Sequence, residues 1–164
     1  QTGVDFSQYK RNTIRRRISR RMALHQVKDF YDYRQMLRGE PGEVERLFKD
    51  LTVNVTRFFR DDFALDRLVE RGVRPLLENK KPETPLRLWV PGCSSGEEAY
   101  TLAILFLEAL ESLEKFFDIK IFATDVNEDA IAAARSGMYP ESISADISGE
   151  RLKRFFSKKG QQRV

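Results

Sequence analysis

The sequence predicts an α/β protein in which an all-helical N-terminal domain is followed by the beginning of a parallel-sheet domain. Two observations support this prediction. Up to residue 71, apolar residues recur every three or four positions, which is the spacing of an amphipathic helix. From residue 86, two short apolar runs alternate with two helical patterns, and the order βαβα predicts parallel strands joined by crossover helices.

The helical part ends before a polar segment. Its apolar residues at helical spacing are Ile14, Ile18, Met22, Val44, Leu47, Phe48 and Leu51. The segment 38–42 contains two glycines and a proline, so we expect it to join two helices. At 78–85, Asn, Lys, Pro and Thr replace the apolar pattern. We therefore expect a helical domain at 1–77, a linker at 78–85 and a second domain at 86–164.

The second domain alternates strand and helix patterns. An apolar run at 86–90 leads into a loop with glycines, and an amphipathic stretch follows at 97–113. A second run at 119–123 is rich in β-branched and aromatic residues, and we expect a further helix at 128–135.

The predicted sheet is incomplete. Parallel sheets are normally covered on both faces and contain more than two strands. Nothing after Asp125 has the pattern of a third strand. We expect a short helix at 151–156, loose polar residues at 157–164, and only the first βαβα part of a larger domain.

The composition argues against several classes of protein. The apolar stretch 101–110 is interrupted by Glu108 and is much shorter than the ~20 residues that cross a bilayer. We expect no signal peptide, no disulfide and no membrane insertion, and hence a cytoplasmic protein. Cys93 and His25 are the only residues of their types, so we expect no metal site. No activating base is evident near Cys93, so it is expected to be a small loop residue, and His25 a surface or capping residue.

Positive charge is concentrated near the N-terminus. The formal net charge is only +4, yet the segment 10–21 contains many Lys and Arg residues and no acid. Arg17, Arg20 and Arg21 flank the apolar stripe of the first helical pattern. These cations could bind an acidic helix or phosphates, although a charged run is often only a solvated helix face.

The loop PGCSSGEE, residues 91–98, follows the first predicted strand. In open α/β sheets, ligands bind at this place, outside the carboxyl ends of the strands. The loop is not the phosphate-binding GxGxxG, and Glu97 and Glu98 lie where a pyrophosphate would bind. This favours a ligand with a cationic group, such as S-adenosylmethionine. The alternative is an ordinary tight turn whose acids complement the helix dipole.

Asp125 ends the second predicted strand. In a doubly wound fold, an acid at this place hydrogen-bonds the two ribose hydroxyls of an adenosine. The alternative is a helix N-cap, a role that Asn127 could serve equally well.

The segment NVTRFFR, residues 54–60, groups polar side chains around two aromatic residues. Arg60 could bind a carboxylate, and Asn54 and Thr56 could fix its approach. The alternative is a helix cap at Thr56, with the two phenylalanines in the core.

Four segments together resemble the chemotaxis receptor glutamate methyltransferases of the CheR type. They are YKRNTIRRRISRRM (9–22), NVTRFFRD (54–61), WVPGCSSGEEAY (89–100) and ATDVNEDAIAAARSGMYP (123–140). The resemblance covers nearly the whole chain. It implies a helical domain followed by a Rossmann-like class I methyltransferase domain, with S-adenosylmethionine bound between them. The N-terminal sequence most resembles that of family members fused to a receptor methylesterase domain.

The resemblance also implies roles for individual residues. The positions that match the cofactor contacts of the family are Asn54, Thr56, Arg60, Glu97 and Asp125. Arg60 is expected at the methionyl carboxylate and Asp125 at the ribose, while Glu98 is an alternative to Glu97. The positions that match the helix meeting the receptor's acidic methylation helix are Arg17, Arg20 and Arg21. Further strands, a second asparagine-bearing cofactor segment and a small antiparallel insertion of the family are expected beyond this sequence.

The implied reaction is methylation of glutamate carboxylates on the cytoplasmic helices of methyl-accepting chemotaxis receptors. The carboxylate attacks the sulfonium methyl in line, and S-adenosylhomocysteine leaves. A glutamate with a pKa of about 4.3 is already ionised near neutral pH, so alignment matters more than a base, and no catalytic residue is assigned. Two alternatives remain: a methyltransferase acting on nucleic acid, and a basic helical module that binds nucleic acid or protein without catalysis.

Overall fold

The computed structural model describes residues 3–52, 56–81 and 85–164. The chain forms two compact units, Gln1–Val53 and Asn54–Val164. No helix in the described ranges is long and apolar enough to cross a membrane.

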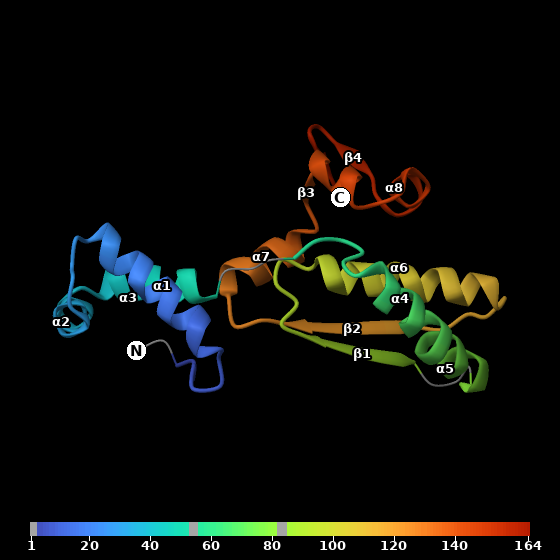
Figure 1. Ribbon diagram of the computed structural model, residues 1–164. Helices are drawn as coiled ribbons and strands as arrows, with labels where there is room; N and C mark the ends of the chain where they lie inside the picture. Colours follow the sequence, from blue (N-terminus) through green and yellow to red (C-terminus); the bar gives the residue numbers. More distant parts are fainter. Residues whose placement is uncertain (1–2, 53–55, 82–84) are drawn as a thin grey trace. The chain divides into compact units, whose positions relative to one another are not determined.

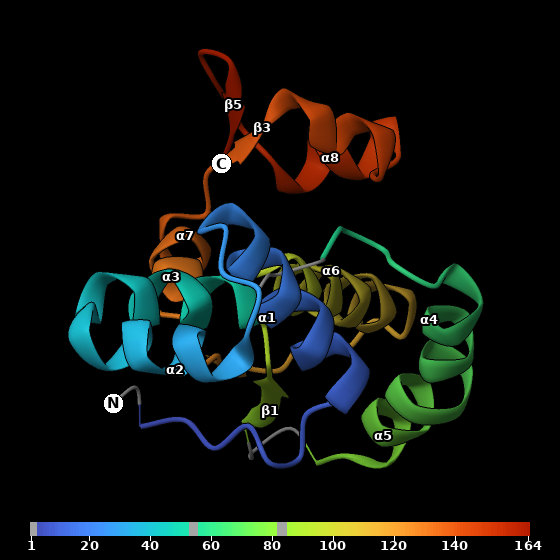
Figure 2. The ribbon, with the colours of Figure 1, turned by 60° about the vertical axis from the view of Figure 1, so that its left-hand side comes forward.

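The first unit consists of α1 (Arg11–Leu24), α2 (Phe30–Gly39) and α3 (Pro41–Leu51). Both α1 and α2 pack against α3, as the blue to cyan helices of Figure 2 show. The side chain of Asp29 caps α2 by accepting a hydrogen bond from the Tyr31 N–H, and Pro41 opens α3, where its missing N–H costs no helical bond. The predicted break at 38–42 is therefore confirmed as the junction of two helices.

The second unit begins with a continuous helical stretch and ends with a small sheet. Its elements are α4 (Asp62–Leu68), the π-helical turn η1 (Val69–Val73), α5 (Arg74–Asn79), β1 (Leu86–Pro91), α6 (Glu97–Ser112), β2 (Ile119–Thr124), α7 (Glu128–Ser136), β3 (Tyr139–Pro140), the 3-10 turn η2 (Glu141–Ala145), α8 (Gly149–Phe155), β4 (Lys158–Lys159) and β5 (Gln162–Arg163). The predicted βαβα order is confirmed as β1-α6-β2-α7.

The boundary between the units lies earlier than the predicted end of the helical domain at residue 77. Val73 and Leu77 are buried against Leu86 of β1 and Phe106 of α6, so η1 and α5 belong to the core of the second unit. The Nζ of Lys115 also donates to the Leu77 carbonyl at 2.8 Å. Helical periodicity predicts these helices, but it does not indicate which core they join.

The sheet of the second unit is parallel, as predicted. β1 and β2 pair in register from Leu86 with Ile119 to Pro91 with Thr124, and α6 runs along one face of them (Figure 1). Trp89 and Phe122 pair with each other, and they are 71% and 53% exposed. Within the described part of the chain, these two large side chains therefore remain open to solvent on the sheet.

The prediction that residues 157–164 are loose is wrong. They contain β4 and β5, which form the antiparallel sheet β3-β5-β4, with α8 beside it in Figure 2. Ser157 and Val164 exchange two backbone hydrogen bonds of 2.7 and 2.9 Å, and Arg163 donates to Glu141 at 2.7 Å. A strand of two residues is too short to show an apolar alternation. Its position is set by the segments with which it pairs. An antiparallel sheet thus lies within the chain, where loose residues were expected.

Candidate cofactor site

The loop between β1 and α6 has an unusual backbone. Gly92, Ser94 and Gly96 have φ values of 70°, 54° and 101°. Glycine adopts this left-handed region freely, but a residue with a Cβ pays a steric cost there. Ser94 is therefore held in its conformation by contacts from outside the loop.

Asp125 supplies one of these contacts. Because β1 and β2 are parallel, their carboxyl ends meet, and Asp125 follows β2 beside the loop. Its Oδ2 accepts from the Ser94 N–H at 2.8 Å, and its Oδ1 accepts from the Asn127 N–H at 2.9 Å. Asp125 is not the cap of α7, since the side chain of Asn127 accepts from the Ala130 N–H. A carboxylate has about four acceptor sites, so each oxygen retains capacity for another donor.

Glu97 is the acid that contacts the loop. The Ser95 hydroxyl lies 3.0 Å and 2.7 Å from its two carboxylate oxygens, and the side chain is half-buried. Glu98 is exposed. Both acids also stand in the first turn of α6, where they complement the helix dipole.

The segment before α4 is only partly described, and Asn54 lies outside the described residues. Thr56 is half-buried and caps no helix, because α4 begins at Asp62 and is preceded by Asp61. Arg60 is 56% exposed, and its Nε is 4.0 Å from a carboxylate oxygen of Asp61. The Arg60 side chain therefore lies at the surface, beside Asp61.

The two aromatic residues of this segment are core residues, as the alternative interpretation predicted. Phe58 is 1% exposed and Phe59 is 8% exposed. Phe59 has a φ of 47°, and its N–H donates to the hydroxyl of the buried Thr101 on α6 at 3.1 Å. This bond fixes the segment to the helix that begins at the loop.

Sequence reasoning missed Thr101 and Tyr139. Tyr139 is 5% exposed, and its hydroxyl donates to the Ser95 carbonyl at 2.8 Å. Burial raises the pKa of this phenol, and the nearby negative charge of Glu97 raises it further. The signal that could have found both residues is a polar group within an apolar pattern, because such a group needs a partner once it is buried.

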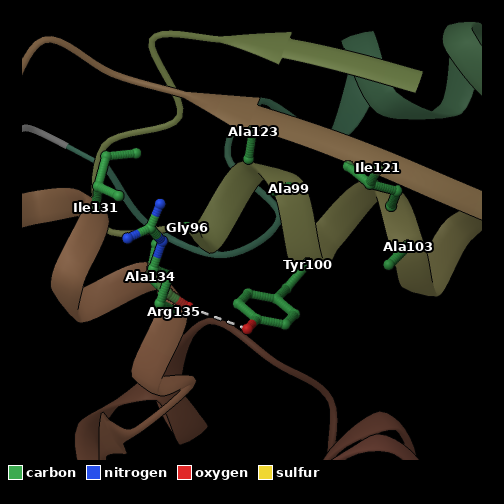
Figure 3. A pocket seen from close by; sticks show the side chains of 9 residues that line it. All are labelled: Gly96, Ala99, Tyr100, Ala103, Ile121, Ala123, Ile131, Ala134 and Arg135. Atoms are coloured by element: carbon green, nitrogen blue, oxygen red, sulfur yellow. Dashed lines mark hydrogen bonds between the residues drawn. The ribbon is translucent and has the colours of Figure 1, made fainter. Parts of the chain in front are cut away.

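Two cavities adjoin the strand end. One of about 330 Å³ lies between α6, β2 and α7, where the Tyr100 hydroxyl donates to the Ala134 carbonyl at 3.0 Å (Figure 3). The other, of about 460 Å³, is lined by the end of β2, by Asp125 and by residues of α7 that include Glu128 and Arg135. Asp125 therefore lies at the edge of a cavity, next to the loop that its carboxylate holds.

The basic residues of α1 divide into two groups. Arg20 is exposed and Arg17 is half-buried. The side chain of Arg21, in contrast, is 12% exposed, and its guanidinium forms a two-bond ion pair with the fully buried Glu43. The predicted substrate-contacting role of Arg21 is thus revised, since its charge holds α1 against α3.

Comparison with known proteins assigns both units to one family. Residues 1–52 match the family model "CheR methyltransferase, all-alpha domain", and residues 54–164 match "CheR methyltransferase, SAM binding domain". The chain belongs to the CheR methyltransferase family. This confirms the resemblance and the expected order of a helical domain and a domain that binds S-adenosylmethionine, abbreviated SAM.

Several relatives are longer than this chain. An uncharacterized 104.1 kDa protein of Rhodobacter capsulatus is 41% identical over 97% of this chain and 17% of its own length. Chemotaxis protein methyltransferase 2 of Pseudomonas aeruginosa is 34% identical over 94% of this chain and 53% of its own. The chemotaxis protein methyltransferase of Borreliella burgdorferi is 32% identical over 85% of this chain and 50% of its own length. The chain therefore spans about half the length of these two methyltransferases.

The residues of the site fit the cofactor that the family name implies. Asp125 has free acceptor capacity, and the acidic loop suits the ammonium and sulfonium of SAM. The Ser94 hydroxyl, in the same loop, is one of the buried polar atoms of the described residues that have no hydrogen-bond partner.

Proposed function

We propose that the protein containing this chain uses SAM to methylate glutamate side chains on the cytoplasmic helices of bacterial chemoreceptors, in the cytoplasm. The observation that supports this best is Asp125 at the end of β2, whose carboxylate is fixed by two backbone N–H groups and which lines a cavity. The names of the P. aeruginosa and B. burgdorferi relatives support the link to chemotaxis.

Each predicted site residue receives one task in this proposal. Asp125 accepts hydrogen bonds from the ribose hydroxyls, and Glu97 faces the cationic methionyl end. Arg60 pairs with the methionyl carboxylate, while Thr56 and Asn54 fix its approach. The cofactor supplies an electrophilic methyl group when bound.

The residues of the chain contribute by aligning the reacting groups. Since the receptor glutamate is already ionised near neutral pH, the rate depends on holding carboxylate, methyl and sulfur in line and on excluding water. Arg20 and Arg17 recruit the acidic receptor helix, and Arg21 acts indirectly by anchoring α1 through Glu43.

Calorimetric titration with S-adenosylhomocysteine tests the cofactor part of this proposal. We expect the chain to bind, and Asp125→Ala to weaken binding about tenfold or more, because charge-assisted hydrogen bonds are lost. Asp118→Ala, which removes an exposed acid at the opposite end of β2, is the matched control and should bind like the parent. A folded chain that ignores the cofactor, or equal losses in both variants, would contradict the proposal.

A further inference from the structure

We infer that Tyr139 is a positioning residue for the cofactor loop, holding the Ser95 carbonyl so that Ser95 presents Glu97 to the bound cofactor. This inference rests on the proposed function for its link to the cofactor. Its structural part, that Tyr139 fixes the loop, rests on the described contacts alone.

Two distant side chains hold the two central residues of the loop, Ser94 and Ser95. Asp125 accepts from the N–H of Ser94, and Tyr139 donates to the carbonyl of Ser95 at 2.8 Å. The two holding residues lie 31 and 44 positions further along the chain. Ser94 carries a Cβ and has left-handed backbone, which is locally unfavourable, so contacts from distant residues help to maintain the shape of the loop.

Tyr139 also lies directly against Gly96. A Cβ built on Gly96 would be 2.8 Å from the Tyr139 oxygen and 3.0 Å from the Ala134 Cβ. The phenol thus occupies the space that any side chain at Gly96 would need. Hydrogen bond and close packing together fix two consecutive residues of the loop, immediately before Glu97.

The ring of Tyr139 extends this contact to the segment before α4. Phe58 packs edge-on against it with centroids 4.8 Å apart. Ser95, whose carbonyl Tyr139 holds, donates its hydroxyl to Glu97. Tyr139 therefore touches both cofactor segments, although it lies on the short strand β3.

Tyr100 offers a matched comparison. Its hydroxyl also donates to a backbone carbonyl, that of Ala134 at 3.0 Å, and its ring packs against Tyr139 with centroids 5.9 Å apart. That carbonyl belongs to α7 and not to the loop. Tyr100→Phe removes a similar hydrogen bond without releasing Ser95.

The test is amide hydrogen exchange of the free chain, followed by titration with S-adenosylhomocysteine, for the parent, Tyr139→Phe and Tyr100→Phe. In Tyr139→Phe we expect exchange of the Ser94 and Gly96 amides to accelerate about three- to tenfold and cofactor affinity to fall by a similar factor. Tyr100→Phe should leave both quantities unchanged. Urea denaturation of each variant identifies any loss of overall stability.

The outcomes separate the inference from the proposed function. Equal exchange in the two variants, or acceleration spread evenly over the second unit, overturns the positioning role even if the parent binds cofactor normally. A parent chain that binds no cofactor counts against the proposed function and against the link to Glu97. The exchange rates then still decide whether Tyr139 fixes the loop.

Discussion

Glu43 is a fully buried carboxylate in a helical unit with no fully buried residue on α1. Besides the ion pair with Arg21, it accepts from the Tyr33 hydroxyl at 2.8 Å and lies 2.9 Å from the Nε2 of His25. Hydrogen bonding from Arg21, opposed by desolvation and aided by Tyr33 and His25, lowers the pKa of Glu43 from 4.5 to about 2. The ionised form is therefore the one that the fold stabilises.

We predict that Glu43→Gln lowers the free energy of unfolding by about 3 kcal/mol near neutral pH. It removes the nearer counter-charge of the largely buried Arg21 and leaves its guanidinium with the more distant carboxylate of Asp50, at 3.8 Å. Since the folded pKa is lowered, the contribution of Glu43 is present above about pH 4.5 and is lost as the pH falls toward 2. The gap between parent and variant should therefore narrow on acidification.

Urea denaturation followed by helical circular dichroism, at several pH values, checks this prediction. Glu45→Gln on the same helix is the control, because Glu45 is 69% exposed and its pair with Lys49 is weak. It should change the stability by less than about 0.5 kcal/mol at any pH. A pH-independent gap for Glu43→Gln would show that the carboxylate charge is unimportant.

At the scale of elements, α6 connects the two predicted cofactor segments. It begins at the loop, and its buried Thr101 accepts the Phe59 N–H. Phe59 and Asp61 both have left-handed backbone, so the turn leading to Arg60 depends on such an anchor.

Thr101→Val tests this anchor, since valine preserves the shape and removes the acceptor. We expect the unfolding free energy to fall by about 1–3 kcal/mol, because the Phe59 N–H is left buried and unpaired. Affinity for S-adenosylhomocysteine should fall as well. Thr101→Ser, which keeps the hydroxyl, should retain most of the affinity; if both variants bind equally, the hydrogen bond does not position Arg60.

The sequence predicted these elements unevenly, for physical reasons. The bounds of β1, α6, β2 and α7 follow from apolar periodicity and agree closely with the structure. The pairing of Lys158–Lys159 with Gln162–Arg163 leaves no periodic trace, and its position is set by contacts such as that of Arg163 with Glu141. Likewise, a polar residue within an apolar pattern indicates that a partner is needed but not which one, so the contacts of Tyr139 and Thr101 were missed. Asp125 was found because its place at the end of a strand is itself visible in the sequence.

At the scale of the whole molecule, the net charge does not show which cations are exposed and which are paired inside the protein. The chain carries a net charge of +4, and the cations of α1 include exposed residues such as Arg20 beside the internally paired Arg21. Sequence alone did not distinguish these two neighbours, because the buried partner Glu43 lies 22 positions away from Arg21. Only the exposed cations are available to an acidic partner.

We predict that Arg20→Glu weakens binding of an acidic helical peptide from a receptor methylation region by about tenfold at low salt, through lost and reversed charge contacts. Arg38→Glu, on the exposed surface of α2, makes the same change in net charge and should have a much smaller effect. Fluorescence anisotropy of a labelled peptide measures both.

Two results would contradict this prediction, one from comparing the two variants and one from measuring nucleic-acid binding at several salt concentrations. If the two variants lose affinity equally, the attraction depends on overall charge and not on a site. If unrelated nucleic acids bind as well as the peptide, with affinity falling linearly in log salt, the basic helix is a phosphate-binding surface and the receptor assignment fails.

Trp89 is the only tryptophan of the chain, and its indole N–H donates to the Thr124 hydroxyl at 3.1 Å, next to Asp125. The molecule therefore contains an intrinsic fluorophore that is hydrogen-bonded to the residue preceding its candidate ribose contact. A ligand that settles at Asp125 will alter the emission of this indole, and a protein surface that covers the sheet will shield it from iodide quenching. Binding at the strand end can thus be followed by fluorescence without attaching any label.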